Sequence, residues 1–110
     1  MLGYALQMQA PVVGQRGTPT TRSIEGTVLD QKGAPVPGAV VLLKDTKTLQ
    51  VRSYIASKEG KYHFFGLSSD INYELRAQAN GFTSGRKDVS VFNSHQLIKM
   101  DLKLKSEKKK

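Results

Sequence analysis

Two histidines and their polar neighbours are the first places where the sequence could do chemistry. His63 and His95 are the only histidines among the 110 residues, and histidine is the side chain that most often acts as a general base. A hydrolase triad could be drawn from Ser57, His63 and Asp70. However, no nucleophile-elbow glycine pattern frames the serine, and no nucleophile, base and orienting group stand in a recognisable relation. The sequence therefore predicts no catalytic residue and no enzyme activity.

Signatures of metal and cofactor binding are also missing from the sequence. The chain has no cysteine, which removes thiolate ligands, thiolate nucleophiles and a disulfide framework. Neither His-x-His nor His-Glu-x-x-His occurs. His63 stands between Tyr62 and Phe64 in an expected strand, so it should point to the face opposite both. We expect no metal site and no cofactor, with His63 facing solvent or making a cross-strand contact.

Exposed aromatic rings would supply a different chemistry, the binding of carbohydrate. Glycan sites need flat aromatic platforms, and the chain has no tryptophan. Tyr54 and Phe65 are the rings that could lie outward, although packing in the core or across strands is the expected fate of both. The other ring-bearing residues that belong to strand motifs are assigned to the core: Tyr62, Phe64, Tyr73 and Phe82.

The positive charge of the chain is concentrated at its C-terminus. The formal net charge is +8, and a lysine-rich end of this kind is typical of a solvated terminus. Away from it, the adjacent basic pair Arg86-Lys87 is followed by Asp88 and is expected in an exposed turn. Phosphate contacts alone would give weak, salt-sensitive affinity, so a basic anion- or nucleic-acid-binding protein is the least favoured interpretation. The terminal lysines are Lys103, Lys105, Lys108, Lys109 and Lys110.

The elements that must position these residues are short strands. Ile71–Ala79 alternates most clearly: its polar residues fall on one face, and the other face carries Ile71, Tyr73, Leu75, Ala77 and Ala79. No segment shows a sustained helical period. About seven strands with turn signals between them predict an all-β fold, a Greek-key β-sandwich. The expected strands are Ser23–Asp30, Ala39–Lys44, Leu49–Ser57, Lys61–Phe65, Ile71–Ala79, a segment marked by Val89, Val91 and Phe92, and Gln96–Lys105.

The last of these strands should carry a polar and an apolar face. Its inward residues are expected to be Ile98, Met100, Leu102 and Leu104. Its outward residues are expected to be Lys99, Asp101, Lys103 and Lys105, and outward lysines discourage pairing between sheet edges.

The stretch GTVLDQKGAPVPGAVVLL, from Gly26 to Leu43, joins the first two strands through a loop. Asp30 can hydrogen-bond to backbone groups a few residues on and begin a turn. Gly33 can adopt positive φ, and Pro35 and Pro37 cannot continue a ladder. Each special residue has a conformational role, so the loop names no ligand-binding residue.

Three ordered motifs resemble those of the carboxypeptidase regulatory-like domain family. The first is Gly26-x-Val28-x-Asp30-x-x-Gly33-x-Pro35-x-x-Gly38-Ala39-x-Val41, and the second is Gly60-x-Tyr62-x-Phe64-x-x-Leu67. The third is Tyr73-x-Leu75 followed by Gly81-Phe82. Their order and spacing agree from about Ile24 to Leu104. Two departures, at Ala56-Ser57 and Ser68-Ser69-Asp70, fall in turns.

The resemblance implies a transthyretin-like (prealbumin-like) β-sandwich that serves as a non-catalytic accessory module. Such modules flank peptidases, outer-membrane receptors and other exported proteins. The implied function is structural or interactive, with a protein or cell-envelope component as partner, outside the cytoplasm. A starch-binding-like carbohydrate module is the alternative. The transthyretin-like fold also houses a purine-catabolic hydrolase that ends in Tyr-Arg-Gly-Ser. This chain shows Lys108-Lys109-Lys110 there, so that activity is not expected.

The expected domain organisation is one sandwich between two flanking segments. Residues 1–22 are expected to be a flexible linker or the remnant of an export signal, because MLGYALQMQAPVVGQ is mildly apolar without a basic n-region. Residues 23–105 are expected to form the sandwich, and 106–110 a basic tail. No run of about 18 apolar residues occurs, so no membrane span is expected.

Overall fold

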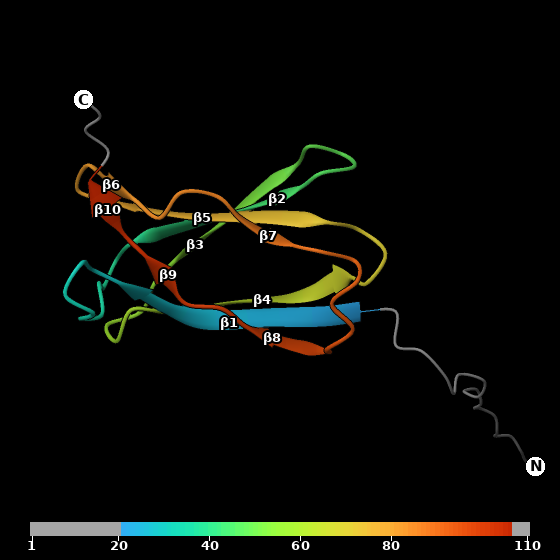
Figure 1. The fold of residues 1–110 in the computed structure, drawn as a ribbon, viewed down its shortest axis with the longest axis horizontal. Coiled ribbons are helices and arrows are strands. Elements are labelled where there is room, and N and C mark those ends of the chain that lie inside the picture. The colour runs from blue at the N-terminus through green and yellow to red at the C-terminus, as the bar shows by residue number, and fades with distance from the viewer. Residues whose placement is uncertain (1–20, 107–110) are drawn as a thin grey trace, which may run out of the picture.

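The computed structural model describes residues 21–106 and builds them into two facing sheets (Figure 1). The described residues are all-strand and contain no helix, so none of them forms a helix that could cross a bilayer. The longer strands are β1 (Thr21–Leu29), β2 (Val40–Asp45), β3 (Val51–Ile55), β4 (Lys61–Ser68) and β5 (Tyr73–Ala79). The shorter strands are β6 (Phe82–Thr83), β7 (Lys87–Val89), β8 (Leu97–Lys99), β9 (Leu102–Lys103) and β10 (Lys105–Ser106).

Each sheet is organised around one long strand. In the smaller sheet β1 lies antiparallel to β4 and parallel to β8 and β9. The larger sheet has the order β10-β6-β5-β2-β3, with β7 also paired to β5. The predicted all-β sandwich is confirmed. β1 begins at Thr21, two residues before the expected strand. The rest of the expected linker, and the basic tail after Ser106, lie outside the described residues.

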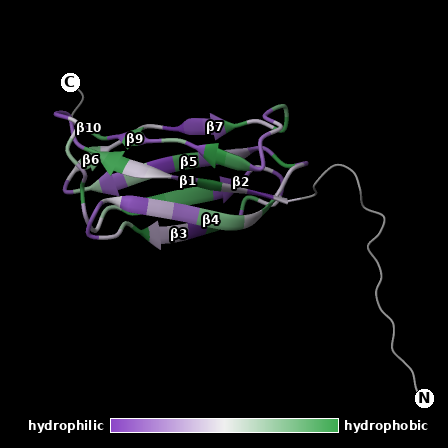
Figure 2. Ribbon diagram, turned by 90° about the horizontal axis from the view of Figure 1, so that it is seen from below, coloured by the Kyte–Doolittle hydropathy of each residue, from purple (hydrophilic) through white to green (hydrophobic). Residues whose placement is uncertain are grey.

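The core consists of side chains that alternate inward from both sheets. On β5, Tyr73, Leu75 and Ala77 are buried while Arg76 and Gln78 are exposed, as the sequence alternation predicts. Figure 2 shows the same alternation as bands of hydrophobic and hydrophilic residues along the strands. The remaining core residues are Ile24, Val28, Ala39, Val41, Leu43, Ala56, Tyr62, Phe64, Leu67, Val89, Ile98, Leu102 and Leu104.

β4 is longer than predicted because it contains a bulge. Ile24 pairs with Phe64 but Arg22 pairs with Leu67, so β4 has one residue more than β1 over this interval. Gly66 has a φ of +69°, the left-handed conformation that glycine supplies at such a bulge. The extra residue returns Leu67 to the core, where it is fully buried. The bulge explains why the second sequence motif has two residues between Phe64 and Leu67.

The expected strand Gln96–Lys105 is interrupted, and the cause lies at Gly26. A Cβ on Gly26 would lie 1.9 Å from the Met100 carbonyl oxygen, so the backbone of Met100 crosses directly over this glycine. The Tyr62 hydroxyl donates to the same carbonyl oxygen, and Asp101 Oδ1 accepts from the Thr27 amide at 3.0 Å. The segment therefore bends between β8 and β9, although its predicted inward and outward faces are retained.

The strand expected at Val89, Val91 and Phe92 is β7, which ends at Val89, so its predicted continuation through Val91 and Phe92 is wrong. The chain turns there, with the Asn93 amide donating to the Ser90 carbonyl at 3.1 Å, and Phe92 is 92% exposed. The carbonyls of Ser90 and Asn93 are both directed at a guanidinium, that of Arg22. This contact orients the turn, and local β-propensity does not reveal it.

Arg22 is the buried charge of the fold, with 3% of its surface exposed. Its Nε donates to Ser68 O at 3.3 Å and its Nη2 to Ile71 O at 2.7 Å. Its Nη1 donates to Ser90 O at 2.8 Å and to Asn93 O at 3.1 Å. No carboxylate within residues 21–106 forms an ion pair with it. Backbone carbonyls from two connections therefore solvate this charge in place of water.

We expect Arg22→Met to lower the free energy of unfolding by about 3 kcal/mol or more, because four carbonyls lose their donor and unmade buried hydrogen bonds cost roughly 1–3 kcal/mol each. Urea unfolding followed by circular dichroism measures this. Arg86→Met is the matched control, since Arg86 makes exposed ion pairs worth about 0–1 kcal/mol. Equal losses in the two variants would contradict the role given to Arg22.

Candidate functional site

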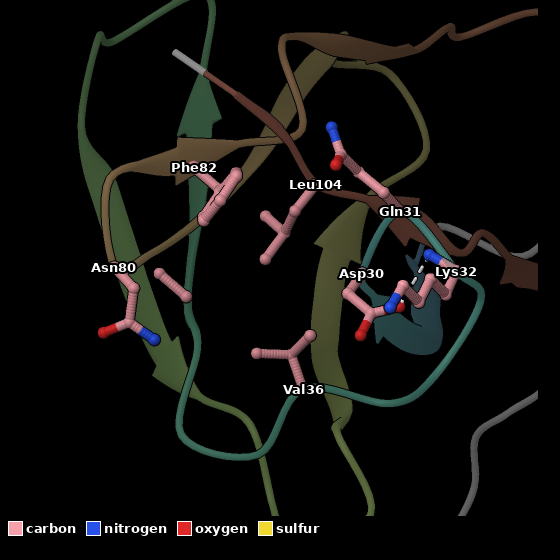
Figure 3. A pocket seen from close by; sticks show the side chains of 8 residues that line it. Asp30, Gln31, Lys32, Val36, Asn80, Phe82 and Leu104 are labelled. Atoms are coloured by element: carbon pink, nitrogen blue, oxygen red, sulfur yellow. Dashed lines mark hydrogen bonds between the residues drawn. The ribbon is translucent and has the colours of Figure 1, made fainter. Parts of the chain in front are cut away.

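A hollow of about 360 Å³ lies at one end of the sandwich. Figure 3 shows Val36, Phe82 and Leu104 pointing toward one another across it. Ala79 completes the apolar wall, and the mouth is lined by polar residues. Apolar walls with a few polar groups at the rim are typical of binding pockets, and this volume is at the lower end of their range of roughly 300–1,000 Å³. The rim residues are Asp30, Gln31, Lys32 and Asn80.

The loop between β1 and β2 forms one side of the hollow, and Asp30 fixes its shape. Asp30 Oδ1 accepts from the amides of Lys32 at 2.8 Å and Ala34 at 2.9 Å. These bonds, led by that from Ala34, hold the pKa of the Asp30 carboxyl below its ordinary value. The Val36 amide then donates to Val28 O at 2.8 Å, which brings Val36 back to the sheet end. The loop geometry matches its predicted conformational role, and the same geometry builds a wall.

The turn from β5 to β6 forms the opposite side. Asn80 and Gly81 both have positive φ, +50° and +82°, and join the paired residues Ala79 and Phe82. A two-residue turn of this kind matches the twist of a hairpin. The assignment of Phe82 to the core is wrong, because 38% of it is exposed. β6 has only two residues and lies at the sheet end, so its ring lines the hollow and no second layer covers it.

The structure does not bring together the hypothetical hydrolase triad of Ser57, His63 and Asp70. Ser57 precedes β4 and Asp70 follows it, and eight residues of strand separate them by roughly 25 Å. Ser57 Oγ accepts from the amides of Glu59 and Lys61, both at 3.2 Å, so it serves a turn. His95 lies 3.1 Å from Asn93 Oδ1 through its Nδ1. Within residues 21–106 no group of three or more histidines and carboxylates could hold a metal ion.

A row of three rings runs along the side of the sandwich where β3 and β4 lie. The ring centroids of His63 and Phe65 are 4.3 Å apart and nearly parallel, and those of His63 and Tyr54 are 4.8 Å apart. Tyr54 also packs on Phe64, so it covers the core edge and is half-buried. Phe65 is 61% exposed. Of the two candidate glycan-contact rings, Tyr54 is packed and Phe65 lies outward.

Beside these rings the outer face of the smaller sheet carries a shallow polar groove of about 400 Å³. It follows β1 where His63 pairs with Glu25 and Glu25 pairs with Lys99. An imidazole, a carboxylate and an ammonium group therefore stand side by side across the sheet. The polar side chains that line the groove are Glu25, Thr27, Lys61, His63, Lys99 and Asp101.

The basic pair at Arg86-Lys87 does not form a phosphate-binding surface. Arg86 Nε lies 3.2 Å from Asp88 Oδ1, and its Nη1 lies 3.8 Å from Glu74 Oε2. Two carboxylates therefore offset its charge locally, which favours the prediction of a solvated turn. Lys108–Lys110 lie outside the described residues.

The hollow was not anticipated from the sequence, although two of its wall residues carried a signal. Leu104 and Ala79 end inward-facing alternations, so each was placed on the core side. Their position at the sheet ends depends on where the loops close, which residue pattern does not give. Val36 stands between Pro35 and Pro37 in a loop, where residue spacing does not indicate which side chain faces inward.

Comparisons with solved structures show the fold. Catechol 1,2-dioxygenase from Acinetobacter sp. ADP1 is similar with a TM-score of 0.59 and 13% identity, over 86% of this chain and 55% of that one. The major pilin subunit BcpA of Bacillus cereus is similar with a TM-score of 0.63 and 16% identity, over 81% and 31%. A streptococcal ancillary pilin is similar with a TM-score of 0.58 and 14% identity, over 81% of this chain and 33% of the pilin. The chain thus spans about a third to half of these structures.

Sequence comparison identifies the family. A search of curated proteins found no match. The model of the carboxypeptidase regulatory-like domain matches residues 23–105, which includes both sheets and all three motifs. That family has a transthyretin-like fold and consists of non-catalytic modules. The chain belongs to the carboxypeptidase regulatory-like domain family.

Proposed function

We propose that the chain is an interaction module of an exported protein, and that it holds a partner polypeptide at the hollow end of the sandwich. The observation that carries this proposal is the apolar hollow walled by Val36, Ala79, Phe82 and Leu104. The pilin subunits of similar fold and the family support a place outside the cytoplasm. The mechanism is passive, because rigid strands and short loops present a preformed surface.

The rim of the hollow favours an acidic segment with one large apolar side chain. Lys32 lies at the rim, and the exposed Lys103 and Lys105 flank Leu104 in the chain. The carboxylate of Asp30 is engaged by two backbone amides. With a net charge of +8, the chain attracts acidic partners at long range. An apolar anchor would fill the hollow while Asp or Glu beside it meets the lysines.

The test is selection of random displayed peptides on the immobilised protein, followed by anisotropy measurements with a labelled selected peptide. We expect enrichment of an aromatic or aliphatic residue next to acidic residues. Ala79→Phe fills the hollow and should weaken binding at least tenfold, about 1.4 kcal/mol. Phe92→Ala, which changes an exposed ring in a different loop, is the control and should leave binding unchanged. Failure to enrich any peptide, or undiminished binding by Ala79→Phe, would refute the proposal.

Carbohydrate binding is a second candidate function, favoured by the exposed Phe65 and its stack on His63 beside the polar groove. A sugar ring would pack on an aromatic face while its hydroxyls meet groove side chains such as Glu25 and Lys99. Tyr54 is packed, so Phe65 is the ring to test.

Native gel electrophoresis in soluble starch tests this candidate. Retardation of the wild-type protein is expected. Phe65→Ala should lose at least tenfold in affinity, because a sugar ring packs on the face of an exposed aromatic side chain. Phe92→Ala is again the control. Migration unaffected by starch, or retardation that Phe65→Ala retains, would remove carbohydrate from consideration.

A further inference from the structure

β3 is an edge strand that carries neither a bulge nor a lysine. It pairs with β2 over five residues without a register shift, and within residues 21–106 it pairs with no other strand. The other edges are protected: β4 carries a bulge, β8 and β9 are short and carry outward lysines, β7 has three residues and begins with Lys87, and β10 has two residues. Proteins use bulges, lysines and short strands to prevent edge-to-edge pairing. A regular edge without them is suited to accept a strand.

The free backbone groups of β3 belong to alternate residues. The Ala56 amide donates to Ala39 O at 2.8 Å, and Gln50 O accepts from the Asp45 amide at 2.9 Å. Even-numbered residues around β3 therefore direct their amides and carbonyls toward β2. Because direction alternates along an antiparallel strand, the amides and carbonyls of Val51, Ser53 and Ile55 point to the open edge.

The side chains at this edge are apolar and exposed. Val51 is 56% and Ile55 61% exposed on the outer face. Leu49, just before β3, is 64% exposed. Exposed apolar side chains on an unpaired edge are suited to contact with a partner strand.

We propose that β3 pairs antiparallel with β3 of a second copy, about a two-fold axis at Ser53. In this register Ser53 faces Ser53, and Val51 of each copy faces Ile55 of the other. These three pairs consist only of residues whose backbone groups point outward, so each pair exchanges two hydrogen bonds. The two larger sheets become one continuous sheet, an isologous contact of the kind that closes a dimer.

The side chains of β3 complement themselves in this register, which is the reason to choose a second copy as the occupant. On the outer face Val51 meets Ile55, a favourable cross-strand pair. On the other face Arg52 meets Tyr54, which allows a cation–π contact. A shift by two residues would set Arg52 against Arg52 and reduce the number of hydrogen-bonded pairs. The strand thus selects one register and rejects a neighbouring one.

Oxidative cross-linking tests the register directly, because the chain has no cysteine. Ser53→Cys would place two thiols on facing residues whose Cα atoms are about 5.5 Å apart, within the range that a disulfide spans. We expect a disulfide-linked dimer from Ser53→Cys. Lys47→Cys, in the exposed turn before β3, is the matched control and should remain mostly monomeric. Equal cross-linking of the two variants would overturn the proposal.

Sedimentation equilibrium up to about 1 mM tests the association itself, because so small an interface belongs to the weak class. Wild-type protein should form dimers, and Ser53→Pro should raise the dimer Kd at least tenfold. That proline removes an outward amide and no bond to β2.

A charge pair provides a variant that does not depend on proline. Val51→Lys with Ile55→Lys sets like charges opposite each other and should abolish the dimer, whereas Val51→Lys with Ile55→Glu sets opposite charges together and should restore it. All four substituted side chains replace exposed ones. A monomeric wild-type protein at 1 mM, or equal behaviour of the two double variants, would show that β3 does not pair with itself.

Discussion

The buried guanidinium of Arg22 is the interaction on which the arrangement of the sandwich depends. A charge removed from water needs polar partners, and here four carbonyl oxygens supply them. Two of these oxygens, on Ser68 and Ile71, lie where β4 gives way to β5. The other two, on Ser90 and Asn93, lie between β7 and β8. One side chain at the start of β1 therefore joins the connections at one end of both sheets.

The opposite end of the molecule is closed differently and leaves a hollow. There β1 ends in a loop held by the carboxylate of Asp30, and β5 ends in the tight turn at Asn80 and Gly81 (Figure 1). Backbone hydrogen bonds and positive φ shape these loops, and no long side chain fills the space between them. The apolar walls are consequently left facing one another with a polar rim. Because one end of the sandwich is closed and the other is open, the hollow at the open end is a preformed surface.

The hollow, the polar groove and the β3 edge arise from different physical features of the same sandwich. The hollow results from loops that close incompletely, and the groove from charged side chains on the outer face of the smaller sheet. The β3 edge results from backbone groups that the larger sheet leaves unpaired. Within residues 21–106 none of them includes a group of three or more histidines and carboxylates that could hold a metal ion. The role proposed for each is contact with a partner.

Local patterns in the sequence predicted what depends on local physics. The alternation on β5 and the motif residues Tyr62, Phe64 and Leu67 placed the core correctly, because inward and outward faces follow from residue spacing. What could not be predicted depends on contacts distant in the chain. The backbone of Met100 crosses over Gly26 and interrupts the last strand. The Arg22 guanidinium donates a hydrogen bond to the Asn93 carbonyl, and the chain turns there where a strand was expected.

Arg22 shows how a signal can be present and still be misread. It stands two residues before Ile24 and four before Gly26, in step with the inward face of β1. Its charge and the turn-forming residues before it favoured a linker, since arginine is rarely buried without partners. The partners are backbone atoms, which a sequence does not display as a motif. The hollow was missed for a related reason, because loop closure decides which apolar residues remain uncovered.

The central claim is that one end of the sandwich is sealed by Arg22 and that the other end is the one that binds. Titration of ¹⁵N-labelled protein with the anionic apolar probe 8-anilinonaphthalene-1-sulfonate, followed by amide chemical shifts, tests it most directly. The account predicts shift changes concentrated at Asp30–Val36, Ala79–Phe82 and Leu104, with Ser68–Asn72 and Ser90–Asn93 unchanged. Changes centred on the Arg22 end, or spread evenly over both sheets, would contradict it.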